Sequence, residues 1–164
     1  MANNFVFEAD LAAKKIYVSR EFNAPVEKVW RAFTEPELLK IWAAPKPWRI
    51  EEQTWDFTVG GASKYLMVGA EGERHWVYDK FTAIENGRSF STIGVFCDEE
   101  GNPNMDGSKS YAETKFFAID GNRTKIETVH TFENENTVKW FIDGGFKEGT
   151  ATTLNQLDIL LASE

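Results

Sequence analysis

Hydrophobic and polar residues alternate along most of this chain, and a few stretches switch to helical spacing. Residues 15–22 place Ile16 and Phe22 on one side of a predicted strand. The next apolar residues recur at spacings of three and four, which predicts two short helices, at 26–33 and 37–42. Two helices inserted directly after a first strand are an unusual order, and they narrow the choice of fold.

A long run of alternating segments follows the helices and predicts a series of strands. Turn-forming residues separate these segments, among them Gly60–Gly61, Asn86–Gly87 and Asp120–Asn122. Connections this short join neighbouring antiparallel strands. The predicted strands lie near residues 48–57, 62–69, 74–85, 88–96, 110–119 and 123–132.

The chain closes with a helical pattern from about residue 137 to residue 162. One helix of about 25 residues would be about 38 Å long, so it must lie across a broad sheet. Residues 1–13 show no strong periodicity, and we expect them to form a lead-in segment. We therefore predict one α+β domain over residues 1–164, with a curved antiparallel sheet of about seven strands and a long C-terminal helix packed across it. A bent sheet and a straight helix leave space between them.

Composition adds that the chain is acidic and rich in aromatic side chains. It contains 13 Phe, 6 Trp and 4 Tyr, together 14% of the residues. Rings of this size either fill a thick core or line a cavity, and composition does not distinguish the two. The net charge of −8 and the lack of a Lys/Arg cluster argue against nucleic-acid binding and against docking on anionic membranes.

We expect a soluble cytoplasmic protein without membrane insertion. The single cysteine, Cys97, rules out an intrachain disulfide. The first residues show no charged segment followed by an apolar one, so we expect no signal peptide. No apolar run approaches the roughly 20 residues needed to cross a bilayer.

Recognisable metal-binding and catalytic motifs are missing from the sequence, so we expect no metal ion and no cofactor. The only histidines, His75 and His130, fall on different predicted strands, and no Cys or His pair has ligand spacing. Cys97 precedes acidic residues, which raise a thiol pKa rather than lower it. Gly60–Gly61 lacks the Lys and Ser/Thr of a phosphate-binding loop.

Three ordered motifs resemble the activator of Hsp90 ATPase homologue-like family of the START-like (SRPBCC) superfamily. The first is the stretch 22–42, which contains Asn-Ala-Pro, then Val-Trp, then Pro-Glu-Leu-Leu. The second is 56–61 followed by Tyr65, and the third is Gly145–Gly149 followed by leucines at helical spacing. The resemblance extends over residues 14–161, nearly the whole chain.

The resemblance implies a helix-grip fold (START-like, Bet v 1-like) with a cavity between the sheet and the C-terminal helix. Superfamily members bind lipids, polyketides, hormones and other apolar molecules, a few catalyse cyclisation or hydrolysis, and the eukaryotic namesake stimulates a chaperone ATPase. Relatives often have tryptophan at or near the positions of Ala43, Ser63 and Thr150 in this chain. If these positions face the cavity, either the pocket is roomier than in relatives or other aromatic residues compensate.

We favour binding of an apolar small molecule such as a lipid, a polyketide or an aromatic metabolite. The alternatives are a co-chaperone-type protein-interaction module and a cyclase- or hydrolase-type enzyme that uses His130 or Asp56. His130 is either a hydrogen-bonded core histidine or a residue that orients the ligand, and Gly149 either allows close helix packing or leaves room for ligand. The expected pocket residues are Trp42, Trp55, Ser63, Tyr65, Met67, Trp76, Thr128, His130, Phe146, Gly149, Thr150 and Thr153, although the facing of Trp55 and Trp76 is open.

Overall fold

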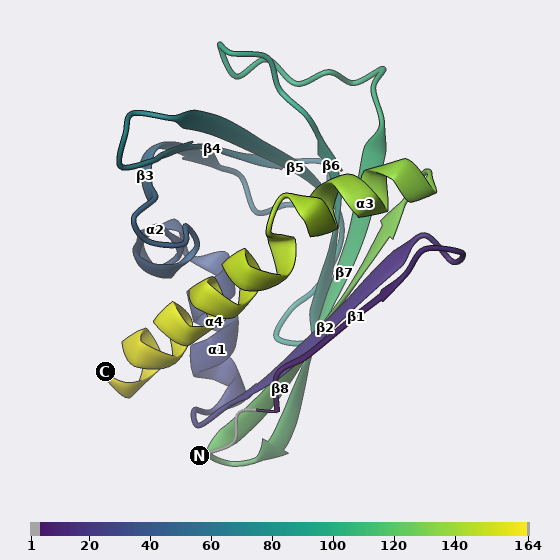
Figure 1. The fold of residues 1–164 in the computed structure, drawn as a ribbon. Helices are drawn as coiled ribbons and strands as arrows, with labels where there is room; N and C mark the ends of the chain where they lie inside the picture. Colours follow the sequence, from purple (N-terminus) through teal and green to yellow (C-terminus); the bar gives the residue numbers. More distant parts are fainter. Residues whose placement is uncertain (1–3, 164) are drawn as a thin grey trace.

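The computed structural model describes residues 4–163, and its strands form one eight-stranded antiparallel sheet in the order β1-β2-β8-β7-β6-β5-β4-β3 (Figure 1). The α+β helix-grip architecture predicted from the sequence is confirmed. The strands are β1 (Val6–Asp10), β2 (Lys15–Phe22), β3 (Arg49–Trp55), β4 (Ala62–Val68), β5 (Arg74–Glu85), β6 (Ser89–Val95), β7 (Lys109–Asp120) and β8 (Arg123–Phe132). The helices are α1 (Val26–Thr34), α2 (Pro36–Trp42), α3 (Glu135–Asp143) and α4 (Phe146–Ala162).

The sheet bends around the helices, which lie on its inner side (Figure 1). Three of the strand pairs contain a register shift, between Ile50 and Glu52, between Phe81 and Ala83, and between Ala118 and Asp120. An irregularity of this kind kinks a strand and increases its twist. The bend explains why a straight helix cannot contact the whole inner face.

The lead-in segment expected over residues 1–13 contains a strand, so the predicted count of about seven strands is one too low. Strand β1 pairs antiparallel with β2, from Val6 opposite Ser19 to Asp10 opposite Lys15. Val6 and Phe7 are half-buried and the other residues of the strand are exposed. A short strand at the edge of a sheet is held by backbone hydrogen bonds, so its sequence does not need the alternation that reveals an interior strand. Residues 1–3 lie outside the described part of the chain.

The long C-terminal helix predicted over residues 137–162 is broken into α3 and α4. The break falls at Gly144–Gly145, where Gly145 has a left-handed backbone with φ 89°. Only glycine adopts this conformation without steric cost, so the helical pattern continues through a point where the helix itself stops. Helix α4 has 17 residues and is therefore about 26 Å long, not about 38 Å.

Helix α4 packs across the sheet through leucines that share one hydrophobic core with β2, β8 and α1. Leu154, Leu157 and Leu161 are at most 5% exposed. Ile16 on β2 and Val29 on α1 are fully buried in the same cluster. Burial of each such side chain stabilises the fold by about 1.5–3 kcal/mol. This core occupies one end of the space under the helices, and the remaining space is the cavity described below.

A buried arginine adds a polar link between α4 and the sheet. Arg20 on β2 is 2% exposed, and its Nη2 lies 3.4 Å from the carboxylate of Asp158 on α4. Its guanidinium carbon also lies 5.0 Å from the centre of the Phe22 ring. Burial lowers the Arg20 pKa, and the Asp158 charge partly opposes that effect.

Candidate functional site

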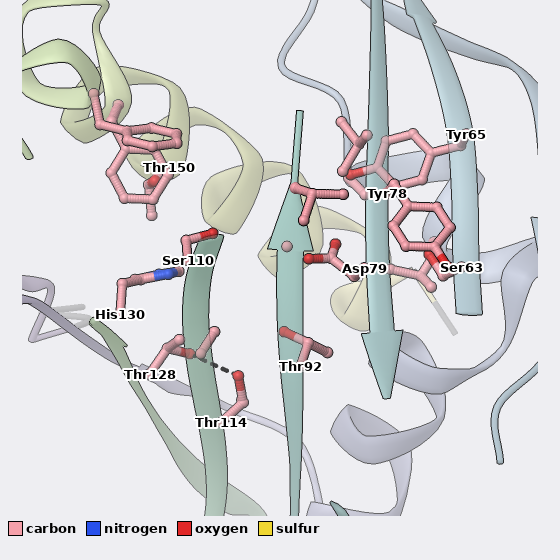
Figure 2. A pocket seen from close by; sticks show the side chains of 18 of the residues that line it. Ser63, Tyr65, Tyr78, Asp79, Thr92, Ser110, Thr114, Thr128, His130 and Thr150 are labelled. Atoms are coloured by element: carbon pink, nitrogen blue, oxygen red, sulfur yellow. Dashed lines mark hydrogen bonds between the residues drawn. The ribbon is translucent and has the colours of Figure 1, made fainter. Parts of the chain in front are cut away.

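A cavity of about 520 Å³ lies between the inner face of the sheet and the helices. Side chains from β2 to β8 form one wall, and side chains from α1, α2, α3 and α4 form the other. His75 and Phe96 border the cavity and are themselves exposed, so the cavity reaches the surface on the side of β5 and β6. Figure 2 shows the polar side chains that project into this space.

Aromatic rings form the two ends of the cavity. At the end near α2, the Trp55 ring centre lies 5.4 Å from that of Phe81, in an edge-to-face arrangement. At the end near the break between α3 and α4, the Phe146 ring centre lies 5.4 Å from Phe141 and 5.2 Å from His130. Such contacts hold the rings in place while leaving their outer faces available to a ligand.

The sheet wall between these ends consists of transverse rows of paired residues, because the strands are in antiparallel register. Each row crosses several strands, and its inward side chains line one level of the cavity. The rows are Ser63–Asp79–Gly94–Ser110, Phe81–Thr92–Ala112–His130 and Phe90–Thr114–Thr128–Val18. Polar residues therefore concentrate in the middle of the wall, between aromatic ends (Figure 2).

The first row contains the carboxyl group of Asp79, which projects over a glycine. A Cβ atom added to Gly94 would lie 2.9 Å from Asp79 Oδ1 and 2.9 Å from Ser110 Oγ. Because position 94 has no side chain, these two oxygens can approach each other above the glycine, and we call the space between them, on the cavity side, the notch. Within residues 4–163 no hydrogen bond or ion pair to the Asp79 side chain is found.

Burial raises the pKa of Asp79 to about 6. The cause is desolvation, since the charged form loses contact with water and has no partner in the protein. Burial, with the Asp79 charge as a second contribution, also raises the pKa of Tyr65 well above its usual value. At neutral pH Asp79 is therefore mostly ionised, and Tyr65 carries its proton as a hydrogen-bond donor.

His130 faces the cavity from β8, on the same side as Ser110 (Figure 2). Burial lowers its pKa to about 4, so the imidazole is neutral at pH 7. Its ring packs edge-to-face on Phe146, and no hydrogen-bond partner for it is found within residues 4–163. In the described part of the chain, His130 therefore lacks the partner that the alternative of a hydrogen-bonded core histidine requires.

Thr128, one residue pair away from His130 on the same face, is hydrogen-bonded within the wall. Its hydroxyl lies 3.0 Å from that of Thr114, and either oxygen can be the donor. Thr114 is 6% exposed. The pair satisfies two hydroxyl groups that would otherwise be buried without a partner.

The structure brings most of the predicted pocket residues to the cavity. Those that border it are Trp42, Trp55, Ser63, Tyr65, Met67, Trp76, Thr128, His130, Phe146 and Thr150. Trp42 also donates its indole N–H to the Ala32 carbonyl at 2.9 Å. Gly149 and Thr153 do not border the cavity: the nearest atom to a Cβ at Gly149 would be Pro45 Cγ, 3.9 Å away, and the Thr153 hydroxyl donates to the Thr150 carbonyl.

Trp76 borders the cavity but also makes contacts away from it, and Asp56 lies outside the cavity. The Trp76 indole N–H donates to the Glu99 carbonyl at 3.2 Å, and its ring packs beside Gly101 and Lys64. Trp76 thus belongs mainly to the contact between β5 and the loop after β6. Asp56 is exposed, accepts a hydrogen bond from Thr58 Oγ1 at 2.8 Å, and does not border the cavity.

Sequence reasoning missed Asp79 and its neighbours Thr92, Gly94 and Ser110. The signal was present in β5, where Val77, Asp79 and Phe81 share one parity and two of the three are apolar. A lone carboxylate within an apolar strand face is the pattern of a functional group. Because both faces of β5 contain aromatic residues, parity alone does not tell which face is inward.

The site offers a titratable carboxyl and a neutral imidazole on different strands of the same cavity wall. Both can accept hydrogen bonds from a ligand, and groups that titrate in this range also meet a requirement of acid–base chemistry. No group of three or more His, Cys, Asp or Glu side chains able to hold a metal ion is found between residues 4 and 163. Over the same residues, no helix is long and apolar enough to cross a bilayer.

The family model described as activator of Hsp90 ATPase homolog 1-like protein matches residues 23–162. The chain belongs to this family. A comparison with curated proteins gives no match. Among solved structures, protein Ms6760 from Mycobacterium smegmatis is 31% identical, with a TM-score of 0.86 over 95% of each chain.

Two further structures show how widely this fold is shared. A protein from Arthrobacter aurescens, solved by NMR in solution, is 30% identical with a TM-score of 0.88, over 97% of this chain and 92% of that chain. The AHSA1 protein from Silicibacter pomeroyi is 20% identical with a TM-score of 0.75, over 90% of this chain and 97% of that chain. The similarity at 20% identity shows the fold alone.

Ala43, Ser63 and Thr150, the three positions singled out from the family resemblance, all lie on the cavity wall. Ala43 borders it from the end of α2, Ser63 from β4, and Thr150 from α4. All three positions thus face the cavity, and both alternatives, a roomier pocket and compensation by other aromatic residues, concern this one space. Small side chains on three sides of one cavity leave volume that larger rings would occupy.

Proposed function

We propose that this chain binds an apolar small molecule in the cavity between the sheet and the C-terminal helices. The observation that supports this function most strongly is the cavity itself, with a volume of about 520 Å³ and aromatic rings at both ends. Ligand pockets in proteins commonly have volumes of about 300–1,000 Å³ and combine apolar walls with a few polar groups. The proposed setting is the cytoplasm, a reducing compartment in which the lone Cys97 stays a thiol.

The two kinds of wall residue have separate roles in this proposal. The aromatic ends supply affinity, because each fully buried side-chain-sized apolar group of a ligand contributes about 1.5–3 kcal/mol. Micromolar affinity corresponds to about 8 kcal/mol, so a ligand must fill several such positions. The polar rows in the middle supply direction, because hydrogen bonds depend on orientation while apolar contacts do not.

A screen with a cavity-filling variant tests the proposal. Ala112 lies in the middle row between Thr92 and His130, and Ala112→Phe places a ring in the cavity. Ala118→Phe on the same strand is the matched control, because Ala118 is exposed. NMR shift mapping with lipids, flavonoids and polyketides should give shifts in cavity residues of the wild type and of Ala118→Phe.

We expect binding to Ala112→Phe to be at least about tenfold weaker, the loss that follows from removing one well-packed apolar contact site. Circular dichroism of each variant verifies that it is folded. Equal binding to Ala112→Phe, or shifts confined to the outer surface, would place the ligand elsewhere and remove the proposal.

A second candidate function is regulation of an Hsp90-type chaperone, which the description of the family suggests. An exposed apolar pair favours it: Phe96 is 40% exposed and Trp140 is 56% exposed, with ring centres 5.3 Å apart. Exposed aromatic residues of this kind are enriched at protein interfaces. Chaperone ATPase rates measured with the wild type and with Trp140→Ala decide it, since no stimulation at saturating concentration rejects this role.

A further inference from the structure

The cavity wall carries one negative charge without a partner and no free positive charge among the described residues. Of the residues that border it, Asp79 is the only carboxylate and Lys109 is the only ammonium group within the described chain. The Lys109 ammonium donates to the Met105 carbonyl at 2.8 Å, and so it is held in the loop between β6 and β7. The Asp79 carboxylate has no such partner. An anionic ligand group would meet repulsion at this point, and a cationic group would meet an unpaired negative charge.

The notch above Gly94 gives this charge a defined receptor geometry. Asp79 Oδ1 and Ser110 Oγ both lie 2.9 Å from the position that a Gly94 Cβ would occupy. Ser63 pairs with Asp79 on the other side, and all of these positions belong to one transverse row. Two oxygens that lie this close to one point can both accept from one ligand nitrogen that approaches from the cavity side.

The surrounding rings reinforce a preference for positive charge. Trp55 and Phe81 border the cavity at its end near α2, beside the row that contains Asp79. The face of an aromatic ring attracts cations, and Trp does so most strongly. Burial has already removed much of the hydration of Asp79 during folding, so a ligand cation gains attraction without that part of the desolvation cost.

We propose that the cavity selects apolar molecules that carry a protonated amine, and that the amine binds in the notch above Gly94, between the Asp79 carboxylate and the Ser110 hydroxyl. This inference rests on the proposed small-molecule binding and names the chemical class of the ligand. Neutral and anionic molecules with the same apolar body bind more weakly.

Amine binding depends on pH through Asp79, because only the ionised carboxylate attracts a cation. The other titratable groups that border the cavity are Tyr65, Tyr78, His75, His130 and Lys109. Burial keeps His130 neutral and Tyr65 protonated over the range in which Asp79 titrates. With the Asp79 pKa raised to about 6, affinity for an amine is full above that pH and falls below it.

The experiment compares three probes that share one bicyclic aromatic body: naphthylmethylamine, naphthylmethanol and naphthoate. Calorimetric titration at about pH 7.5 gives their affinities for the wild type, for Asp79→Asn, and for the control Glu52→Gln. Glu52 is exposed on β3, so this control makes the same change in net charge outside the cavity. We expect the wild type and Glu52→Gln to bind the amine about 10- to 100-fold more tightly than the alcohol, the range for a hydrogen bond to a charged group.

Asp79→Asn should bind the amine and the alcohol with affinities within about threefold of each other, because no charge remains in the notch. Gly94→Ala should weaken amine binding selectively, since the new Cβ displaces the Asp79 and Ser110 oxygens that receive the amine. At about pH 5 the wild-type affinity for the amine should fall about tenfold, with little change for the alcohol.

The outcomes separate this inference from the proposed function. Equal wild-type affinities for amine and alcohol, both abolished by Ala112→Phe, would leave cavity binding intact and overturn the amine preference. An amine preference that persists in Asp79→Asn would also overturn it. Failure of all three probes to bind would contradict the proposed function, and this inference would fall with it.

Discussion

Replacing Asp79 with asparagine measures how much the buried carboxylate lowers the free energy of unfolding. Burial raises the pKa of Asp79 from its usual 3.8 to about 6. One pH unit of displacement corresponds to about 1.4 kcal/mol, so the ionised group costs up to about 3 kcal/mol near pH 7. Because Asp79 is partly accessible from the cavity, we expect the free energy of unfolding of Asp79→Asn to exceed that of the wild type by about 1–3 kcal/mol at pH 7.

The pH dependence of this difference has a definite sign. The folded protein binds the Asp79 proton more tightly than the unfolded chain does, so this group destabilises the fold progressively as the pH rises from about 4 to about 6. The advantage of Asp79→Asn should therefore be small at pH 4 and complete near pH 7. His130 acts in the opposite direction, because its lowered pKa removes stability as the pH falls from about 6.5 towards 4. Both proteins contain His130, so its contribution cancels in the difference.

Urea unfolding of the wild type, Asp79→Asn and the control Glu52→Gln, at intervals from pH 4 to pH 7, is the assay. Glu52→Gln should track the wild type at every pH, since the exposed Glu52 side chain is hydrated in both states. A difference between wild type and Asp79→Asn that stays constant with pH would refute the reasoning. A variant less stable than wild type at pH 7 would show that the carboxylate has a favourable partner in solution.

The remaining predictions concern the helix break and the wall hydroxyls. Gly145→Ala should destabilise the fold by about 1 kcal/mol, because φ is 89° there. Gly149→Ala, the matched control within α4, should stabilise the fold by about 0.5–1 kcal/mol, since the new Cβ contacts only Pro45, at 3.9 Å. Equal effects of the two substitutions in thermal unfolding would contradict this expectation. Thr114→Val and Thr128→Val should each lower the free energy of unfolding by about 1–2 kcal/mol, because each leaves the partner hydroxyl without a hydrogen bond. In urea unfolding, the double variant should lose less than the sum of the two single losses. Strictly additive losses would argue against the hydrogen bond.

The order of elements was predictable because interior strands and amphipathic helices leave strong patterns in a sequence. Strand β8 is an example, with Ile126, Thr128, His130 and Phe132 on one inward face. Strand β1 was not predicted, since an edge strand held by backbone pairing needs no alternation. The break at Gly144–Gly145 was missed for a related reason: apolar spacing continues across it, and only the backbone angle at Gly145 interrupts the helix.

The candidate site was predictable in part. Strand parity assigned Tyr65 and His130 to the inner face, and both border the cavity, whereas it left the facing of Trp55 and Trp76 open. Asp79 was not found, because its importance depends on the missing side chain at Gly94 and on Ser110, two strands away. Residues brought together by sheet register are separated in sequence by a loop and a strand, and one sequence contains no signal of their proximity.

The division of the cavity wall into transverse rows has a consequence for how relatives diverge. Each row spans several strands but contributes only side chains to the hollow, while the backbone ladder holds the strands together regardless of what those side chains are. A mutation in one row therefore changes the lining of the cavity at one level and leaves the neighbouring rows unchanged. Relatives that descend from one ancestor can thus change their ligand preference through a few substitutions in one row, while the fold stays the same.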